Sequence, residues 1–409
     1  MRATSLTSAG AQRLIRKSHT LPHKRPALFV VLVFLIALNL AIYLTYVLTF
    51  FGHNDFRLYY AGAEVGLQSG WAHIYDVKLD QAAVAALQPG GPWYALLTPA
   101  PITWVVAPLT LLGYPAAYWV WVAFSLAILG AAVWYARPRQ HSVALYFIWW
   151  AALSPLWFSA YEGQVTIVVA AAVLAGWRLL ESRRDFVAGM VLGAALFKPH
   201  LVLLLPLALL VSGRTRALLG FAAVAAVMGI AMLLTLHLSG IQSYLATLLA
   251  PQAAGDTAKT LRSALGGSPV VLAIQAAAVI AVIAVAFHAR RTRAAWPVVI
   301  AALLGSFLLA TYWHPQDYLT LDAAAAIMLA AGPLEAGILM AAVVAFVSTP
   351  VSPLTGRQMT WAWLLTAIVF LGFLGVRAVM RPKSPTSIAS AIRLSSTRVV
   401  AVGQEPGPN

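Results

Sequence analysis

Long apolar runs recur along this chain from residue 27 to residue 377, and no other feature limits its fold as much. Most of them approach the length, about 17–25 residues, at which an α-helix crosses the hydrocarbon core of a bilayer. Only 10% of the residues are charged, whereas a soluble domain has about 25%. So few charges cannot cover a water-facing surface. The sequence therefore predicts an all-α, polytopic membrane protein with about twelve transmembrane helices.

The predicted transmembrane domain, 27–377, lies between a basic cytoplasmic N-terminus, 1–26, and a disordered cytoplasmic tail, 378–409. The first apolar segment is too long for the apolar core of a signal peptide, so we interpret it as an uncleaved first span. The twelve apolar segments are approximately 27–51, 115–136, 143–159, 164–181, 186–197, 201–212, 217–236, 269–288, 295–312, 318–332, 334–349 and 359–377.

One further apolar stretch, 95–112, contains Pro99, Pro101 and Pro108, and proline removes a backbone donor and kinks a helix. If this stretch does not cross the membrane, most of the 27 Lys and Arg residues fall on the cytoplasmic side together with both termini. That distribution obeys the positive-inside rule, which a crossing at 95–112 would break. We therefore predict a re-entrant or interfacial pair of short helices in the outer half of the membrane.

Two large outer loops follow from this topology, 52–114 (which includes the re-entrant segment) and 237–268. Most carboxylates fall on the same side, although acidic residues contribute little to topology. Their gathering indicates a functional surface outside the cytoplasm. We find no inverted repeat and no run of charged residues in mid-span, the features expected of a transporter site.

Several classes of site are absent from the sequence. There is no cysteine, and the nine histidines form no metal motif, so no metal site and no cofactor is predicted. No phosphate-binding loop of a nucleotide domain is present. The net charge of +15 comes from short clusters between apolar runs, which indicates contact with membrane lipid and not with nucleic acid. Chemistry outside the cell therefore requires an activated donor carried by the membrane, because nucleotide sugars are cytoplasmic.

Asp55 lies a few residues beyond the first apolar segment. A carboxylate held at the membrane surface and partly desolvated has a raised pKa, which suits removal of a proton from a sugar hydroxyl. The alternative is a solvated aspartate that caps a helix beginning at Phe56.

Lys198 and His200 lie between two apolar segments of about 18 Å each, too short to span comfortably. The segments 186–197 and 201–212 therefore predict a hairpin of short helices with both side chains at its tip. A cation buried there indicates a function, and its natural partner is a phosphate. The alternative is a lysine that extends to the lipid headgroups.

Two short outer turns offer further polar groups. One contains Trp313, His314 and Asp317, which supply an aromatic wall, an imidazole and a carboxylate; its aromatic residues could equally form an interfacial belt. The other contains Glu162 and Gln164, and it could equally be a plain polar turn.

The order of these motifs resembles glycosyltransferase family 87. The first-loop motif is Asp55-Phe56-Arg57-Leu58-Tyr59-Tyr60-Ala61-Gly62, followed by Gly70 and Ile74-Tyr75-Asp76. The later motifs are Leu97-Thr98-Pro99-Ala100-Pro101 with Ala107-Pro108-Leu109, Glu162-Gly163-Gln164, Ala188-Gly189, Phe197-Lys198-Pro199 and His314-Pro315-Gln316-Asp317-Tyr318. The proline segment matches the family's tyrosine-proline-proline motif only loosely.

The resemblance implies the GT-C fold, a helical membrane bundle with short helices over its outer face. It also implies an inverting hexosyltransferase similar to polyprenyl-phosphate-mannose-dependent α-1,2-mannosyltransferases. Such an enzyme moves a hexose, usually mannose, from a polyprenyl phosphate to an extracytoplasmic glycan or glycolipid. The implied location is a bacterial cytoplasmic (inner) membrane, with the active site facing the periplasm.

The resemblance also assigns roles to single residues. Asp55 would be the general base, and a preorganised cation would stabilise the departing phosphate. The residues implied to bind the donor phosphate are Lys198, His200 and His314. Those implied to contact the substrate are Tyr59, Tyr60, Gln164, Trp313 and Asp317.

Two other functions share much of this pattern, a lipid-linked oligosaccharide ligase and a flippase or transporter of a lipid-linked sugar. A ligase transfers a whole glycan from a diphosphate donor. A flippase needs polar residues along a path through the membrane, and the apolar segments contain few away from their ends. The sequence indicates neither the acceptor nor the oligomeric state.

Overall fold

The computed structural model describes residues 25–91, 93–138, 143–250, 259–348 and 356–380. These residues form helices and connecting turns, without a β-strand among them, so the all-α prediction is confirmed for the described part of the chain. The helices are α2 (Arg25–Phe50), α3 (Phe56–Ser69), α4 (Val77–Leu87), α5 (Pro101–Val106), α6 (Tyr114–Ala136), α7 (Val143–Ala151), α8 (Ser154–Tyr161), α9 (Thr166–Glu181), α10 (Asp185–Gly193), α11 (Leu205–Val211), α12 (Thr215–Leu249), α13 (Leu261–Leu265), α14 (Pro269–Thr292), α15 (Trp296–Leu309), α16 (Leu319–Ala331), α17 (Leu334–Ser348) and α18 (Gly356–Met380). Short 3-10 helices include η2 (Phe51–His53), η3 (Trp71–His73), η4 (Ala107–Leu112), η5 (Ala194–Phe197), η6 (Pro199–Val202) and η8 (Pro315–Tyr318).

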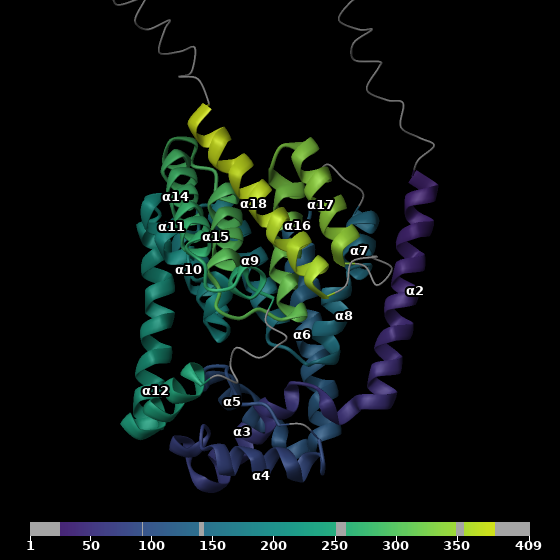
Figure 1. The fold of residues 1–409 in the computed structure, drawn as a ribbon, viewed down its shortest axis with the longest axis vertical. Helices are drawn as coiled ribbons and strands as arrows, with labels where there is room; N and C mark the ends of the chain where they lie inside the picture. Colours follow the sequence, from purple (N-terminus) through teal and green to yellow (C-terminus); the bar gives the residue numbers. More distant parts are fainter. Residues whose placement is uncertain (1–24, 92, 139–142, 251–258, 349–355, 381–409) are drawn as a thin grey trace, which may run out of the picture.

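The long helices run between two ends of the molecule (Figure 1). The first residues of α2 and the last residues of α18 lie at the same end, at the top of the view. Helices α3, α4 and α5 lie at the opposite end. In the part of the chain that the structure describes, these three helices form a cap on one end of the bundle, as expected of the predicted outer face.

Five segments are long and apolar enough to cross a membrane, and they include α2, α6, α12, α14 and α18. Helices α7 and α8, bent by 56° at their junction, form a sixth if the pair counts as one span. Each of the twelve predicted apolar segments contains helix. Several of those helices are shorter than a span, such as Asp185–Phe197 and Pro199–Val211. A count of twelve membrane-spanning helices is therefore not confirmed.

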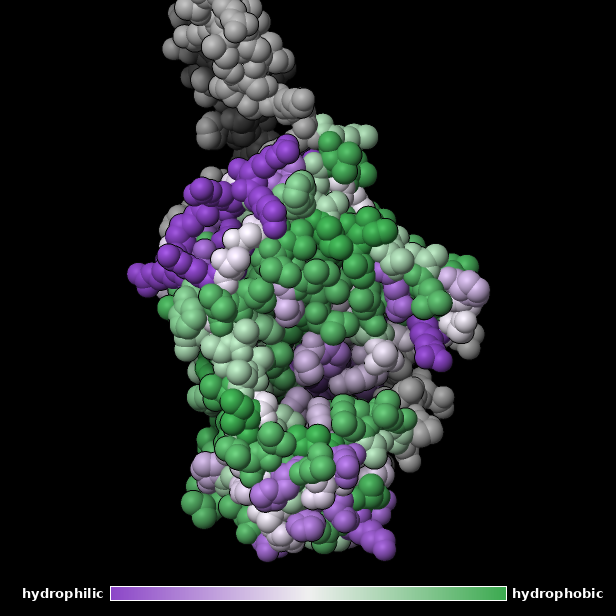
Figure 2. Space-filling model, turned by 90° about the vertical axis from the view of Figure 1, so that its left-hand side faces the viewer, coloured by the Kyte–Doolittle hydropathy of each residue, from purple (hydrophilic) through white to green (hydrophobic). Residues whose placement is uncertain are grey.

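The surface has the polarity of a membrane protein. In Figure 2 a broad hydrophobic band separates hydrophilic side chains at the two ends, and a hollow with less hydrophobic side chains interrupts the surface below the band. Large apolar side chains are exposed on α2 and α12, including Phe34 at 58% and Leu234 at 69%. A water-soluble monomer rarely exposes a continuous apolar surface of this extent.

The junction of α7 and α8 shows how a break inside the bundle is stabilised. Two residues, Ala152 and Leu153, interrupt the helical pair. Asn39 on α2, which is buried, donates from Nδ2 to the carbonyl oxygen of Ala152 at 2.9 Å and accepts from Ser154 Oγ at 2.9 Å. A buried side chain thus replaces the helical partner that the break removes, as membrane helices require.

The two predicted outer loops contain helices of their own. The stretch 95–112 forms α5 and η4, which pack on α3; its re-entry into the membrane stays a prediction. The apolar part of α12 ends at a kink at His237, where φ is +54°, and the helix then continues to Leu249 inside the predicted 237–268 loop. Part of that loop, 251–258, lies outside the described residues.

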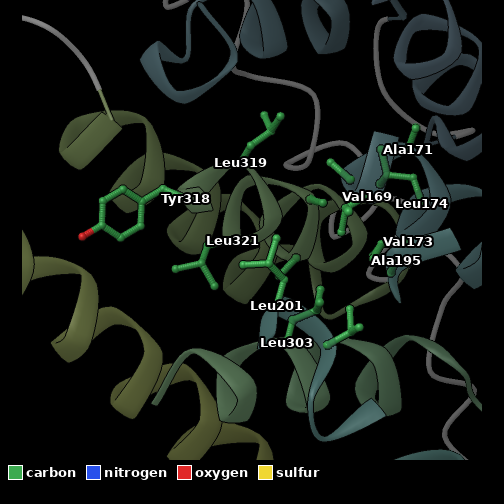
Figure 3. Close-up of a cluster of buried hydrophobic side chains, with 14 of the residues drawn as sticks. Val169, Ala171, Val173, Leu174, Ala195, Leu201, Leu303, Tyr318, Leu319 and Leu321 are labelled. Atoms are coloured by element: carbon green, nitrogen blue, oxygen red, sulfur yellow. The ribbon is translucent and has the colours of Figure 1, made fainter. Parts of the chain in front are cut away.

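A tightly packed core lies beneath the polar residues described below. Figure 3 shows apolar side chains of α9, α15 and α16 meeting those of η5 and η6, including Val173, Leu303 and Leu321. Ala195 and Leu201 belong to this core and are fully buried. They flank Lys198 in the sequence, so the core fixes the backbone on both sides of that lysine.

Candidate active site

Asp55 is the residue immediately before α3, and the turn after α8 fixes its backbone. Its N–H donates to Glu162 Oε2 at 2.9 Å, and the next N–H, of Phe56, donates to the carbonyl oxygen of Glu162 at 2.9 Å. The Asp55 side chain makes no capping hydrogen bond to α3 within the described structure. The capping alternative is therefore wrong, and the carboxylate points to other groups.

The turn that holds Asp55 is itself firmly fastened to α6. Trp121 Nε1 donates to the carbonyl oxygen of Gly163 at 2.7 Å, and the Tyr118 hydroxyl bonds the carbonyl oxygens of Ala160 and Tyr161. Gly163 has φ +59°, and a Cβ there would lie 2.6 Å from Cβ of Phe56. Only glycine combines this backbone conformation with this approach of α3.

Two glutamine side chains meet the Asp55 carboxylate. Gln164 and Gln316 both donate from Nε2 to Asp55 Oδ2, the latter at 3.3 Å. The hydroxyl of Tyr59 donates to Gln164 Oε1 at 2.9 Å and so orients that amide. The family resemblance implied that Gln164 contacts the substrate, and this stays a prediction. In the structure its amide donates a hydrogen bond to the carboxylate of Asp55.

Lys198 lies where η5 ends and η6 begins, between two short apolar helices as predicted. Its side chain is only 8% exposed, and Nζ lies 2.5 Å from Asp317 Oδ1 and 3.1 Å from Thr166 Oγ1. A buried ion pair of this kind replaces the headgroup contact that a surface lysine would seek. The alternative of a lysine extending to the headgroups is therefore wrong.

Asp317 lies at the centre of the group of residues that surrounds Lys198. Besides Lys198, it accepts from Thr166 Oγ1 at 3.0 Å and from the N–H of His314 at 3.1 Å, and His200 Nε2 lies 3.7 Å from its Oδ2. Burial works against its charge, but Lys198 and His200 outweigh burial and hold the pKa of Asp317 well below its usual range. Asp317 is therefore ionised and is fully buried.

The turn η8 joins the two parts. Gln316 contacts Asp55, and the next residue, Asp317, contacts Lys198. The turn is held by Ser159 Oγ, which donates to the carbonyl oxygen of Gln316 at 3.0 Å. One short turn thus brings the carboxylate of Asp55 and the ammonium of Lys198 into one hydrogen-bonded network.

Burial sets the charges of the remaining groups. It raises the pKa of Glu162 well above its usual value, and the neighbouring Asp55 adds to the effect. Burial lowers the pKa of His314, whose ring accepts from the N–H of Asp317. Burial therefore favours the uncharged form of both groups. The side chain that pairs with Asp317 is Lys198.

Two of the predicted aromatic contacts adjoin the site, since Tyr59 bonds Gln164 and the ring of Trp313 lies beside that of His200. Tyr60 instead packs on Phe56 and Tyr114. Tyr59, Tyr60 and Trp313 are 2%, 3% and 0% exposed, and the hydroxyl of Tyr60 donates to the carbonyl oxygen of Thr110. Trp313 therefore does not belong to an interfacial belt. A direct contact of these rings with a sugar stays a prediction, because each ring is covered by protein in this conformation.

Two contributors were not predicted as site residues, Thr166, which begins α9, and Gln316, which lies inside the predicted outer turn. Glu162 was predicted as a polar group of its turn, and in the structure it accepts from the N–H of Asp55. No sequence signal links Gln316 to Asp55, because their contact joins residues far apart in the chain. Within the described ranges, no three or more His, Cys, Asp or Glu residues are placed to hold a metal ion.

Comparison with known proteins gives one match. The model of the family described as glycosyltransferase family 87 matches residues 97–315, more than half of the chain. The matched region includes Gln164, Lys198, His200 and His314, whereas Asp55 lies outside it. No curated protein and no solved structure matches.

Proposed function

The chain belongs to glycosyltransferase family 87, and from this premise we propose that it moves a hexose, specifically mannose, from a polyprenyl phosphate to an extracytoplasmic glycan or glycolipid, with inversion. Membership of this family makes the protein a membrane-embedded glycosyltransferase of helical architecture, consistent with the GT-C superfamily. The donor, the acceptor and the stereochemistry are the proposed part.

One observation carries the proposal. A partly exposed carboxylate, Asp55, and a buried ammonium, Lys198, belong to the same network, and Asp55 lies immediately before α3. A transfer from a sugar phosphate needs both, a base for the incoming hydroxyl and a cation for the departing phosphate.

In the proposed reaction Asp55 accepts the proton of the acceptor hydroxyl. The hydroxyl oxygen attacks the anomeric carbon of the donor and forms the new glycosidic bond. The bond between the anomeric carbon and the phosphate oxygen breaks on the opposite face, and the leaving oxygen keeps the electron pair. The configuration at the anomeric carbon is therefore inverted, and the phosphate gains one negative charge.

Lys198 would neutralise the charge that develops on the phosphate. Its ammonium is preorganised by Thr166 and Asp317 in a site from which water is largely excluded, where such a charge acts more strongly than in water. His200 and His314 both lie next to Asp317 and would add hydrogen bonds to the phosphate oxygens.

A nearby apolar groove supports a lipid-linked donor. The groove has a volume of about 230 Å³ and lies between α2, α8, α17 and α18. Its lining includes Tyr46, Trp157 and Trp363, and it reaches Pro315 and Tyr318, which belong to the same turn as Gln316 and Asp317. An isoprenoid chain in this groove would bring its phosphate toward Lys198.

The test is transfer of radiolabelled mannose from a defined polyprenyl phosphate in membranes that contain the full-length protein. Asp55→Asn keeps the size of the side chain but removes the base, so we expect the rate to fall about 10²–10⁴-fold. Asp76→Asn is a matched control, since Asp76 is exposed and caps α4 through an oxygen that asparagine retains. Undiminished transfer by Asp55→Asn would contradict the mechanism.

The same assay separates the alternatives. Lys198→Met should lower both the rate and the affinity for the donor, and thermal unfolding of the purified variant shows whether it remains folded. Transfer of an oligosaccharide from a diphosphate carrier, with no use of a monophosphate sugar, would favour a ligase. Movement of a lipid-linked sugar across liposomes without transfer would favour a flippase.

A further inference from the structure

The two glutamines at Asp55 are built into the site more firmly than a chance contact requires. Gln164 and Gln316 are 4% and 5% exposed. Gln164 receives a hydrogen bond from the buried hydroxyl of Tyr59, and the backbone of Gln316 receives one from Ser159 Oγ. Because a carboxylate is only an acceptor, each amide must present its NH₂ group to Asp55.

Both amides bond the same carboxylate oxygen. Asp55 Oδ2 accepts from Gln164 and Gln316, whereas Oδ1 has no hydrogen-bond partner among the described residues. The side chain of Asp55 is partly exposed, so Oδ1 is the oxygen left to meet another molecule. The protein thus holds the carboxylate through Oδ2 and leaves Oδ1 available to a substrate.

We infer that Gln316, together with Gln164, is a positioning residue that holds the general base by its Oδ2 and aims Asp55 Oδ1 at the acceptor hydroxyl. The inference rests on the proposed function and adds to it a residue with no direct part in the chemistry. Gln316 also sits beside Asp317, which binds Lys198. The same turn therefore sets where the base lies relative to the phosphate site.

Two hydrogen bonds to the charged form of a carboxylate favour that form. Without the Gln316 amide, Asp55 binds its proton more readily, so the acidic limb of the rate profile moves to higher pH. The Gln316 contact, at 3.3 Å, is long for a hydrogen bond. We therefore expect the acidic limb to move by about 0.5–1 pH unit, so that kcat at a given pH on that limb falls by about three- to ten-fold.

The experiment compares kcat and the donor KM of the purified full-length protein between pH 5.5 and 9, with a defined polyprenyl phosphate mannose as donor. Gln316→Leu removes the amide. Gln316→Glu keeps the shape but places a second carboxyl beside Asp55, so it should shift the acidic limb further in the same direction. Gln275→Leu is the matched control, because it removes a glutamine amide on α14 that donates at the same distance, 3.3 Å, to the carbonyl oxygen of Leu308 on α15 and not to a carboxylate.

The expected result is a shifted acidic limb for both Gln316 variants, with the donor KM within about two-fold of the unmodified protein because the Lys198–Asp317 pair is intact. A merely structural role would scale the whole profile down without moving it, and that result overturns the inference. If Gln316→Leu does not fold, the isosteric Gln316→Glu alone decides. Loss of transfer in Asp55→Asn with an unshifted Gln316→Glu profile would remove the positioning role and leave the proposed function standing.

Discussion

The aspartates in and next to α3, α4 and η8 have different environments, and these decide what each can do. Asp317 is sealed among Lys198, Thr166 and the N–H of His314, so its charge is fully used inside the protein. Asp55 has one oxygen bonded to amides and one left for another molecule. Asp80 on α4 is buried, and its carboxylate accepts one hydrogen bond among the described residues, from Trp93 Nε1 to Oδ2. Residue type alone therefore does not identify the base.

Asp80 should make the stability of the cap formed by α3, α4 and α5 depend on pH. Burial raises its pKa to about 6, and the hydrogen bond from Trp93 Nε1 at 2.7 Å opposes this only partly. The folded protein therefore keeps the proton that the unfolded chain releases near pH 4. Stability is unaffected below pH 4, falls as the pH rises toward 6, and above pH 6 bears the full cost, at most about 3 kcal/mol.

Asp80→Asn should remove this dependence, because its side-chain oxygen still accepts from Trp93 and has no proton to lose. Relative to the unmodified protein, the variant should gain stability as the pH rises from about 4 to about 6, and the difference should then stay constant. Thermal unfolding of both proteins in detergent measures the difference, with Asp76→Asn as an exposed control. A difference that is the same at every pH would show that Asp80 is ionised in the folded protein.

At the scale of helices, close packing of α10 and α12 depends on two glycines. A Cβ on Gly220 would lie 2.1 Å from the carbonyl oxygen of Phe186, and one on Gly189 would lie 1.9 Å from that of Ala217. Both obstacles are backbone atoms, so the helices themselves would have to separate. Small residues at such crossings are how membrane helices approach each other.

Gly220→Ala should therefore destabilise the protein by about 1–3 kcal/mol, the usual cost of overpacking. It should also lower transfer, since α10 continues through η5 to Lys198. The control is Gly229→Ala on the same helix, where a Cβ meets no atom within 4 Å of the described structure. Equal melting temperatures and equal transfer rates for the two variants would contradict this account of the packing.

Helices were easier to predict than the site. The apolar segment 115–136 became α6 within a residue, because composition and length alone decide a helix in lipid. The residues of α3 and α4 have no comparable apolar run. The sequence offered a helix beginning at Phe56 only as an alternative for Asp55, and the short helices over the outer face were implied by the family resemblance. The meeting of Asp55 with Gln316 could not be predicted, because it depends on the fit of Gly163 against Phe56 and on the position of η8.

At the scale of the whole molecule, the question is which side of the membrane the site faces. The first residues of α2 and the last residues of α18 lie at the same end of the molecule, opposite α3 and α4 (Figure 1). The basic cluster Arg290, Arg291 and Arg293 ends α14, and the positive-inside rule places such clusters in the cytoplasm. The polar network beside α3 should then face the outside.

The absence of cysteine from the sequence makes this directly testable. Lys78→Cys on α4 and Arg291→Cys at the end of α14 each replace an exposed residue with a unique thiol. A membrane-impermeant maleimide should label the first in intact cells and the second only after the membrane is opened. The reverse pattern would place Asp55 in the cytoplasm, where nucleotide sugars are available. A lipid-linked donor would then no longer be required, because the argument for it depends on a site beyond the reach of those nucleotides.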